Sequence, residues 1–453
     1  MLENIISIGL SNIAFSYVNE KTKLNLVKYN KIFQNKMNIN LLHYKLLSAK
    51  YIIIQPNGKG KEYYHDGRLL FEGEYLNKKK HGKGKEYIIF SKEIKFEGEY
   101  LNGKRNGIGK EYDKGNKLLF EEQYLNGKRW NGKGYDKNNN IIYELKDGKG
   151  YVKEYNYGNL YFEAEYSNGE KNGKGKEYDF NGKLEFEGEY LNNKKNGKGR
   201  EYFSNGKLKF KGEYLNNCRW NGIGYDKFNE ILYIIKNGKG KVIDIYDYDY
   251  ISEGQYINGQ KNGKGMTFSK GKLTFKGEYI NGRRTGKGKE YNDKDQLVFD
   301  GEYLYSYKLK GKEYINGKLE YEGEYLFDKK WNGKGFDEKG NIIYELNNGT
   351  GNCKEYNYRE KLIYEGEYLN GKRNGKGKEY DYYGKIMFEG EYLNGKKWKG
   401  KGKEFKYENF GELIFEGEFE NGKRWNGKGK EYDNNYKLLF NGEYINGEKK
   451  PIN

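Results

Sequence analysis

The residues that most often carry catalysis are few and scattered in this chain of 453 residues. The three histidines, His43, His65 and His81, all lie in the first fifth of the sequence. None of them has a nucleophile or a metal-ligand partner at motif spacing. Cys218 and Cys353 lie far apart, and two cysteines are too few for a secreted disulfide scaffold, which favours a reducing compartment. We therefore expect no catalytic residues, no metal site and no cofactor.

Two recurring patterns resemble parts of catalytic or phosphate-binding sites. Pairs of glutamates such as Glu72 and Glu74 suggest acid–base work, but similar pairs recur along most of the chain. Their recurrence favours cross-strand pairing with lysine on a polar face. Gly-Lys-Gly triplets are also frequent, yet the chain has no G-x-x-x-x-G-K-[ST] sequence and no following helix to hold a phosphate. We interpret these glycines as turn and strand glycines.

The composition excludes both a disordered chain and an ordinary compact globule. There are 65 glycines, 49 tyrosines and only 2 prolines, and aromatic residues make up 17% of the sequence. Disordered chains are poor in aromatic residues, whereas a globule of this length needs more aliphatic residues. A thin repeat array, with much surface per residue and with aromatic contacts in place of a thick core, fits both facts.

The charge leaves two interpretations open. The chain has 84 Lys and Arg against 66 Asp and Glu, a net charge of +18. This excess suits an anionic partner such as a membrane surface, an acidic protein or nucleic acid, but interspersed Lys and Glu also simply solvate a large surface. No apolar run is long enough to cross a bilayer, and the start of the chain lacks a basic segment and a cleavage site. We expect a cytoplasmic protein, peripheral at a membrane where the anionic-partner interpretation holds.

Two segments of the chain have different patterns. Residues 1–50 contain a single glycine and space their apolar residues by three and four, which is typical of two or three short amphipathic helices. From Tyr51 onward, glycines punctuate the sequence regularly. We therefore predict a helical N-terminal segment, residues 1–50, and a repeat array, residues 51–453.

The array repeats the pattern F-E-G-E-Y fourteen times. The last aromatic residue of each copy is Tyr75, Tyr100, Tyr124, Tyr166, Tyr190, Tyr214, Tyr256, Tyr279, Tyr303, Tyr325, Tyr368, Tyr392, Phe419 and Tyr444. Three wider gaps each contain a shortened unit, centred on Tyr143, Tyr233 and Tyr344, after a tryptophan in W-N-G-(K/I)-G. Spacing this regular indicates about 17 structural repeats.

The segment from Tyr364 to Tyr380 illustrates one unit. Tyr364 and Tyr368 share one face of a strand, Asn370-Gly371 is a turn signal, and Asn374-Gly375 is a second one. The returning strand is then expected from Lys376, with Lys372 and Arg373 at the hairpin tip. We predict a mainly β fold: an elongated single-layer antiparallel sheet of stacked β-hairpins with a short α-helical N-terminal cap.

Residues 364–380, YEGEYLNGKRNGKGKEY, resemble the MORN-repeat family (membrane occupation and recognition nexus), in its variant form. The resemblance extends over about 390 residues of the chain. It implies stacked hairpins, assembly with protein partners, dimerisation and tethering near membranes.

Residues 14–36, AFSYVNEKTKLNLVKYNKIFQNK, faintly resemble the helical F-box and F-box-like adaptor module, although the usual opening Leu-Pro is missing. That resemblance implies docking onto a ubiquitin-ligase subunit. The alternative is a plain helical cap or another partner-binding piece.

Two sets of side chains are candidates for binding. Basic hairpin tips are candidates for contact with anions or membranes: Lys78, Lys79, Lys80, Lys104, Arg105, Arg283, Arg284, Lys372 and Arg373. Tryptophans near turns are candidates for holding a partner helix or peptide: Trp130, Trp220, Trp331, Trp398 and Trp425. Solvated turns and rings that pack on one another are the alternatives.

These patterns favour a non-enzymatic scaffold that binds protein partners and anionic phospholipid surfaces, with a homodimer as a further expectation. The alternative is a ubiquitin-ligase substrate adaptor that uses residues 1–50 to recruit the ligase. Nucleic-acid binding ranks lower, because the basic residues are balanced locally by Glu and no nucleic-acid motif is present.

Overall fold

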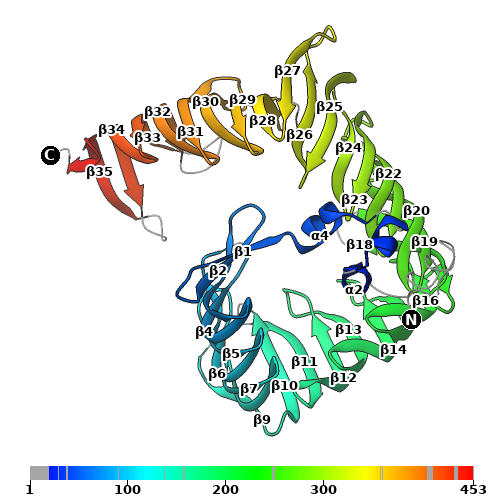
Figure 1. Cartoon of the computed structure of the whole chain (residues 1–453). Coiled ribbons are helices and arrows are strands. Elements are labelled where there is room, and N and C mark those ends of the chain that lie inside the picture. The colour runs from blue at the N-terminus through cyan, green and yellow to red at the C-terminus, as the bar shows by residue number, and fades with distance from the viewer. Residues whose placement is uncertain are drawn as a thin grey trace. The chain divides into compact units, whose positions relative to one another are not determined.

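The computed structural model describes residues 20–28, 30–36, 39–89, 91–136, 138–156, 159–246, 250–357, 359, 361–405, 412–432 and 437–451. Within these residues the fold is mainly β, with short helices near the N-terminus (Figure 1). The predicted fold class, antiparallel hairpins in an open sheet with a helical N-terminal part, is confirmed.

The described helices are α2 (Glu20–Val27), α3 (Lys31–Lys36) and α4 (Leu41–Ser48). Leu24, Val27 and Leu46 are buried, and the Tyr44 hydroxyl donates a hydrogen bond to the Leu24 carbonyl at 3.0 Å. Asn40 caps α4 in a capping box with His43. The first part of the predicted helical segment, residues 1–19, lies outside the described residues.

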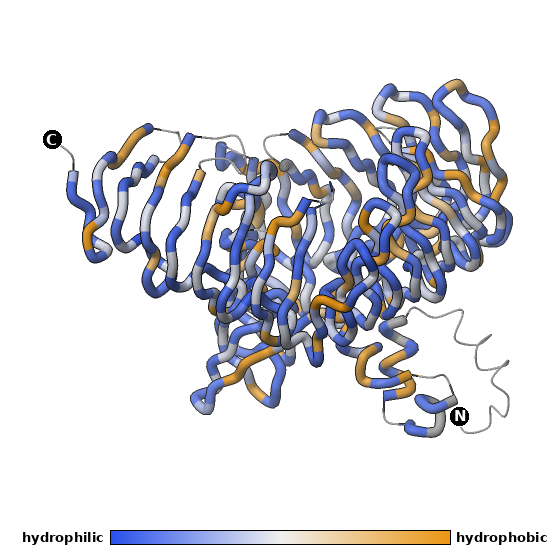
Figure 2. The backbone as a smooth tube through the Cα atoms, turned by 90° about the horizontal axis from the view of Figure 1, so that it is seen from above, coloured by the Kyte–Doolittle hydropathy of each residue, from blue (hydrophilic) through white to orange (hydrophobic). Residues whose placement is uncertain are grey.

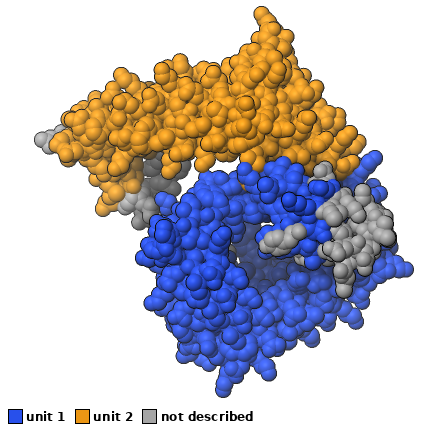
Figure 3. All heavy atoms as spheres, in the orientation of Figure 1, with its two compact units in different colours: residues 1–271, 279–283 blue, residues 272–278, 284–453 orange. Residues whose placement is uncertain are grey.

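The chain divides into two compact units (Figure 3). Unit 1 holds residues 1–271 and 279–283, and unit 2 holds residues 272–278 and 284–453. The division falls within β21 (Lys272–Ile280). The strands of unit 1 are β1 (Lys50–Ile54), β2 (Lys59–Tyr64), β3 (Leu69–Leu76), β4 (Lys79–Tyr87), β5 (Ile94–Leu101), β6 (Lys104–Tyr112), β7 (Leu118–Leu125), β8 (Lys128–Tyr135), β9 (Ile141–Leu145), β10 (Gly150–Asn156), β11 (Asn159–Ser167), β12 (Glu170–Tyr178), β13 (Leu184–Leu191), β14 (Lys194–Tyr202), β15 (Leu208–Leu215), β16 (Cys218–Tyr225), β17 (Ile231–Ile235), β18 (Gly240–Tyr246), β19 (Tyr250–Ile257) and β20 (Gln260–Ser269).

Unit 2 repeats the same type of element. Its strands are β22 (Arg283–Tyr291), β23 (Leu297–Leu304), β24 (Tyr307–Ile315), β25 (Lys318–Leu326), β26 (Lys329–Phe336), β27 (Ile342–Asn347), β28 (Thr350–Tyr356), β29 (Leu362–Leu369), β30 (Lys372–Tyr380), β31 (Ile386–Leu393), β32 (Lys396–Phe405), β33 (Leu413–Glu420), β34 (Lys423–Tyr432), β35 (Leu438–Ile445) and β36 (Glu448–Pro451).

Within each unit, strands that follow one another in the chain pair antiparallel, with no crossover. In unit 1, the strands β1–β9 form one hydrogen-bonded sheet and β10–β17 another. The shortened units interrupt the ladder: β9 and β10 are joined only by the bridge Lys146↔Lys149, and β17 and β18 only by Lys236↔Lys239. The third shortened unit, at β27 and β28, keeps two paired positions. The sheet is therefore less continuous than the repeat pattern predicts.

Each long hairpin turns at an Asn-Gly pair or its equivalent. Asn370 and Gly371 have φ values of 54° and 71°, so both residues adopt the left-handed conformation of a type I′ turn, as predicted. The predicted second turn, at Asn374-Gly375, is wrong. The chain continues there as strand β30, in which the pairs Tyr368↔Arg373 and Gly366↔Gly377 enclose a β-bulge. The bulge accommodates the second Asn-Gly without reversing the chain.

The core is one layer of rings on a bare backbone. Phe96 is fully buried and lies edge-to-face with Tyr100 of its own strand, at 5.7 Å between ring centroids, and with Tyr124 of the next hairpin at 5.0 Å. A Cβ on Gly109 would lie 2.5 Å from Phe96 Cζ, so the ring occupies space that a side chain would need. Figure 2 shows the corresponding pattern, in which hydrophobic residues occupy short stretches of the strands. Edge-to-face packing over glycine thus replaces a second layer.

The glycine requirement gives a first prediction, for Gly98→Ala. The new Cβ would meet Gly109 Cα at 2.6 Å and the Ile108 carbonyl oxygen at 2.7 Å, and backbone atoms cannot move aside cheaply. We expect a loss of about 1–3 kcal/mol and a lower melting temperature by circular dichroism.

The matched control is Gly206→Asn. Gly206 has a φ of 80° and open space around it, and asparagine tolerates this conformation. We expect a change of a few tenths of a kcal/mol. Equal destabilisation by both substitutions would contradict the packing explanation.

Candidate functional site

Every hairpin presents two different faces to possible partners. In the hairpin of β5 and β6, Phe96 pairs with Glu111, whereas Glu97 pairs with Lys110 on the neighbouring ladder position. Because side chains alternate along a strand, the first pair shares a face with the buried rings and the second pair lies on the opposite face. We call these the aromatic face and the lysine–glutamate face.

A layer of ion pairs covers the rings of the aromatic face. The Arg105 guanidinium lies 3.9 Å from the Phe96 ring centroid and forms ion pairs with Glu86 at 2.7 Å and Glu111 at 2.9 Å. The Tyr124 hydroxyl donates to Glu111 at 2.8 Å. Such a basic residue therefore joins the carboxylates of two different hairpins. The basic residues with two acidic partners on this face are Arg105, Arg129, Arg219, Lys308, Lys330 and Arg373.

Electrostatics keep this layer charged near neutral pH. Burial raises the pKa of Glu111, but Arg129, Arg105 and the Tyr124 hydroxyl outweigh burial and lower the pKa to about 2. Glu201 has the same pKa of about 2, because Arg219 and the Tyr214 hydroxyl overcome its burial. A buried carboxylate with these partners remains ionised near neutral pH, so Glu111 and Glu201 contribute satisfied charges to the aromatic face.

The structure corrects the placement of four predicted basic tips. Lys80, Arg105, Arg284 and Arg373 do not lie at tips but on the aromatic face, over phenylalanine or tyrosine rings at 3.9 to 4.2 Å. The reason is that the returning strand begins four residues earlier than predicted, at Lys372 instead of Lys376 in the case of β30, and alternation then turns the second basic residue toward the rings.

The remaining predicted tips do lie at turns or beside them. Lys78 is in the turn between β3 and β4 with a φ of 60°, and it is exposed, as are the first residues of the returning strands, Lys79, Lys104 and Arg283. Lys372 is half-buried at the start of β30. Their contact with anions or membranes stays a prediction.

The predicted tryptophans occupy the turn edge of the sheet. A Cβ on Gly238 would lie 2.7 Å from Trp220 Cζ3, and one on Gly349 would lie 2.8 Å from Trp331 Cε3, so these rings pack against glycines of neighbouring turns. Trp398 and Trp425 lie in the same way near Gly422 and Gly447. The carbonyl of every one of these tryptophans accepts a hydrogen bond from a turn glycine, which for Trp130 is Gly148 at 2.7 Å. The tryptophans join hairpins at their turns, and partner binding by them stays a prediction.

The lysine–glutamate face carries one paired row of charges. Lys85 and Glu97 form an ion pair at 3.4 Å, and the Tyr112 hydroxyl donates to Glu97 at 2.7 Å. The same cross-strand arrangement joins Lys354 to Glu365 and continues in other hairpins. The expected structural role of the recurring glutamates is confirmed at these positions.

In a second row on this face several lysines have no carboxylate partner in the described part of the chain, although Lys334 and Lys401 pair with Glu345 and Glu418. Lys174 lies opposite Glu189, but the Glu189 carboxylate accepts a hydrogen bond from the Lys198 backbone N–H at 2.9 Å. The lysine at the centre of Gly-Lys-Gly is thereby left exposed. Exposed lysines of this kind for which no ion pair is found among the described residues include Lys59, Lys83, Lys174, Lys198, Lys287 and Lys376. We call these residues the free lysine row.

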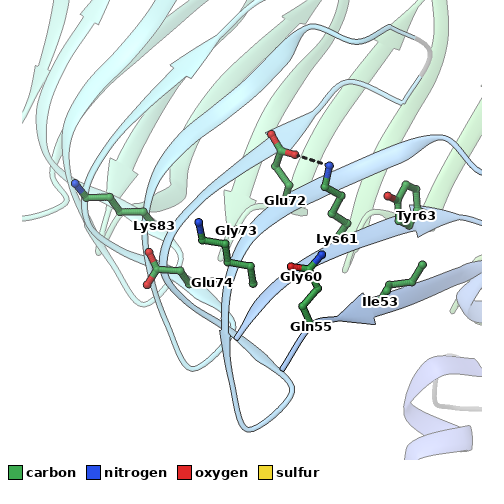
Figure 4. Close-up of a pocket in the computed structure, with 10 residues that line it drawn as sticks. Ile53, Gln55, Gly60, Lys61, Tyr63, Glu72, Gly73, Glu74 and Lys83 are labelled. Carbon is green, nitrogen blue, oxygen red and sulfur yellow. Dashed lines mark ion pairs between the residues drawn. The ribbon is translucent and has the colours of Figure 1, made fainter. Parts of the chain in front are cut away.

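The glycine backbone forms the floor of grooves between these rows. In unit 1, a groove of about 500 Å³ contains Lys59 and Lys83 together with the Lys61–Glu72 ion pair (Figure 4). In unit 2, a groove of about 580 Å³ contains Lys376 and reaches the buried Cys353. Burial raises the pKa of the Cys353 thiol to about 12, so it is not a nucleophile near neutral pH.

The three histidines lie in or beside elements of secondary structure. His43 closes the capping box of α4, the His65 backbone N–H donates to the Ala49 carbonyl at 2.8 Å, and His81 lies in β4. Among the described residues no group of His, Cys, Asp and Glu has the arrangement of a metal site. No helix in the described part of the chain is long and apolar enough to cross a membrane.

Residues 14–19 of the F-box-like string lie outside the described residues, and the rest of the string contains α2 and α3. The ligase-adaptor interpretation stays a prediction.

Sequence analysis did not single out the glutamates of the aromatic face. Glu111 and Glu379 belong to the recurring K-E-Y sequence, two residues after the second glycine of G-x-G. That spacing of two places them on the face of the glycines and therefore beside the rings. The two-residue spacing between glycine and glutamate could therefore have identified these glutamates. The second turn, wrongly predicted at Asn374-Gly375, obscured which residues share a face of the strand.

The ion-pair layer gives a second prediction, for Glu111→Gln. Folding lowers the pKa of Glu111 from 4.5 to about 2, so its stabilising contribution is complete above about pH 4.5 and is lost as the pH falls toward 2. We expect the free energy of unfolding to fall by on the order of 3 kcal/mol at pH 7, and the difference from the unmodified chain to shrink toward pH 2 in thermal melts.

The matched control is Glu338→Gln, which removes a solvent-exposed partner of Lys318 and should change stability by less than about 1 kcal/mol. A difference for Glu111→Gln that stays constant with pH would contradict this account.

Comparison with known proteins agrees with the geometry. Nine segments match the MORN repeat: residues 55–67, 71–88, 96–117, 162–183, 186–207, 253–272, 275–296, 364–382 and 415–436. Comparison with curated proteins gave no match. MORN repeats are consistent with a non-enzymatic interaction role. With nine repeats in the hairpins described above, the chain is a MORN-repeat protein.

Proposed function

We propose that this protein is a non-enzymatic scaffold that binds protein partners and anionic membrane surfaces. The observation that carries the membrane part is the free lysine row on the lysine–glutamate face. The MORN repeats support the protein-binding part. Basic residues of the aromatic face that form ion pairs, such as Arg105 and Arg373, do not contribute, because carboxylates already neutralise them.

The geometry of the free lysine row suits an extended anionic surface. Successive hairpins add two strands, so equivalent lysines such as Lys59 and Lys83, or Lys174 and Lys198, are about 9.6 Å apart. A lysine close to an anionic bilayer contributes about 1 kcal/mol, and salt weakens this contribution. Four lysines of unit 1 in contact with one surface would therefore give a measurable, salt-sensitive affinity.

This proposal gives a third prediction, tested by co-sedimentation of the full chain with vesicles. We expect the chain to pellet with phosphatidylcholine vesicles that contain phosphatidylserine and not with phosphatidylcholine alone. Substituting Lys59, Lys83, Lys174 and Lys198 by alanine should weaken partitioning more than about tenfold.

The matched control replaces four lysines of the paired row, Lys61, Lys85, Lys110 and Lys153, and so removes the same net charge. These lysines have carboxylate partners at 3.2 to 3.9 Å. We expect this control to weaken partitioning less. Equal pelleting with both kinds of vesicle, or equal effects of the two substitutions, would refute the membrane contact by the free lysine row.

A further inference from the structure

Many turns of this protein are built from the dipeptide Asn-Gly, which is chemically labile. Asparagine is among the thermolabile residues, because the backbone nitrogen of the next residue can attack its side-chain amide. Glycine in that next position has no side chain to hinder the attack. The fate of the glycine N–H in the folded chain therefore decides which asparagines are exposed to this reaction.

At the hairpin tips the glycine N–H is committed to a hydrogen bond. The Gly371 N–H donates to the Gly349 carbonyl of the preceding tip at 2.9 Å. The Gly395 N–H donates to the Arg373 carbonyl of the preceding hairpin at 2.8 Å. Equivalent bonds to the preceding hairpin are donated by Gly103, Gly127, Gly238, Gly259, Gly282, Gly349, Gly422 and Gly447. Stacking of the hairpins thus holds these N–H protons.

The turn between β24 and β25 lies at the sheet edge opposite the tips and is different. Asn316 and Gly317 have φ values of 50° and 75°, and both residues are exposed. A Cβ on Gly317 would have no atom within 4 Å, so nothing covers this turn. No acceptor for the Gly317 N–H is found among the described residues.

The length of the neighbouring connections explains this difference. Residues 292–296 join β22 to β23, and residues 337–341 join β26 to β27. These longer loops close on themselves, as where the Gly340 N–H donates to the Asp337 carbonyl at 3.0 Å. The two-residue turn between β24 and β25 is too short to close in this way, so its glycine N–H points to solvent.

We propose that Asn316 is a site of spontaneous deamidation in the folded protein. The Gly317 nitrogen attacks the carbonyl carbon of the Asn316 side chain, and a new N–C bond forms as the C–NH₂ bond breaks. The Gly317 amide proton leaves with the amino group as ammonia, and a five-membered succinimide remains. Water then opens the succinimide to aspartate or isoaspartate. The inference is independent of membrane binding and of protein partners.

The products would alter the hairpin that carries them. Isoaspartate adds one carbon atom to the main chain, whereas the turn is fixed by the direct pair Ile315↔Lys318. The same two strands hold Glu313 and Glu320, which both form ion pairs with Lys330 of β26. A longer turn would shift the register of these carboxylates, so we expect the modified chain to melt at a lower temperature.

The experiment is incubation of the full chain at mildly alkaline pH, followed by digestion at acid pH and tandem mass spectrometry. Asn370 and Asn394 are internal controls, because each is also followed by Gly-Lys. We expect Asn316 to be converted about fivefold faster than either control, since one hydrogen bond must open first at the tips. In urea the three rates should agree. Equal rates in the folded chain, or an excess at Asn316 that persists in urea, would overturn the proposal.

Hydrogen exchange gives an independent readout, because exchange and cyclisation both remove the same N–H proton. We expect peptides that contain Gly317 to exchange faster at that turn than peptides that contain Gly371. Asn316→Gly keeps a residue that accepts a positive φ and removes the reacting side chain. After incubation, the melting temperature should fall for the unmodified chain and not for this variant. A slowly exchanging Gly317, or an equal fall for both chains, would contradict the assignment to Asn316.

Discussion

The structure depends on a phenylalanine or tyrosine ring lying directly on glycine backbone. Gly98 and Gly109 are opposite one another beneath the Phe96 ring, and a Cβ on either would collide with it. Because the Phe96 ring lies in contact with the glycine backbone, Tyr124 of the next hairpin can pack against it edge-to-face. A single layer can then bury its own core, and the abundance of glycine and tyrosine follows from this one contact.

The same contact determines which charged side chains lie on each face of the sheet. A ring on bare backbone leaves its outer surface uncovered, and the long Arg and Lys side chains of the returning strands cover it by cation–π contact. A cation placed there needs a carboxylate, which Glu86, Glu111 and their equivalents supply. These ion pairs neutralise the cations that cover the rings, whereas the free lysine row lies on the other face.

The sequence predicted the repeat, the antiparallel hairpins and the Asn370-Gly371 turn, because glycine and asparagine signals act locally. It failed at Asn374-Gly375, where the same dipeptide has another role. The Asn374 side chain accepts a hydrogen bond from the Asn394 backbone N–H at 3.1 Å, and Gly375, with a φ of 85°, lies inside the bulge. That partner is twenty residues away in the next hairpin, so no local pattern distinguishes the two uses. The basic tips were misplaced for this reason alone.

The bulge also explains why lysines of the free lysine row lack ion-pair partners among the described residues. The bulged backbone turns an N–H toward the second glutamate of F-E-G-E-Y, as at Lys198, and that carboxylate is used by the backbone. The lysine opposite it, Lys174, loses its natural cross-strand partner although the ladder register is intact. A backbone irregularity needed for packing therefore converts a balanced Lys–Glu sequence into a surface with free positive charge. Part of the net charge of +18 is thereby located on the lysine–glutamate face of the sheet.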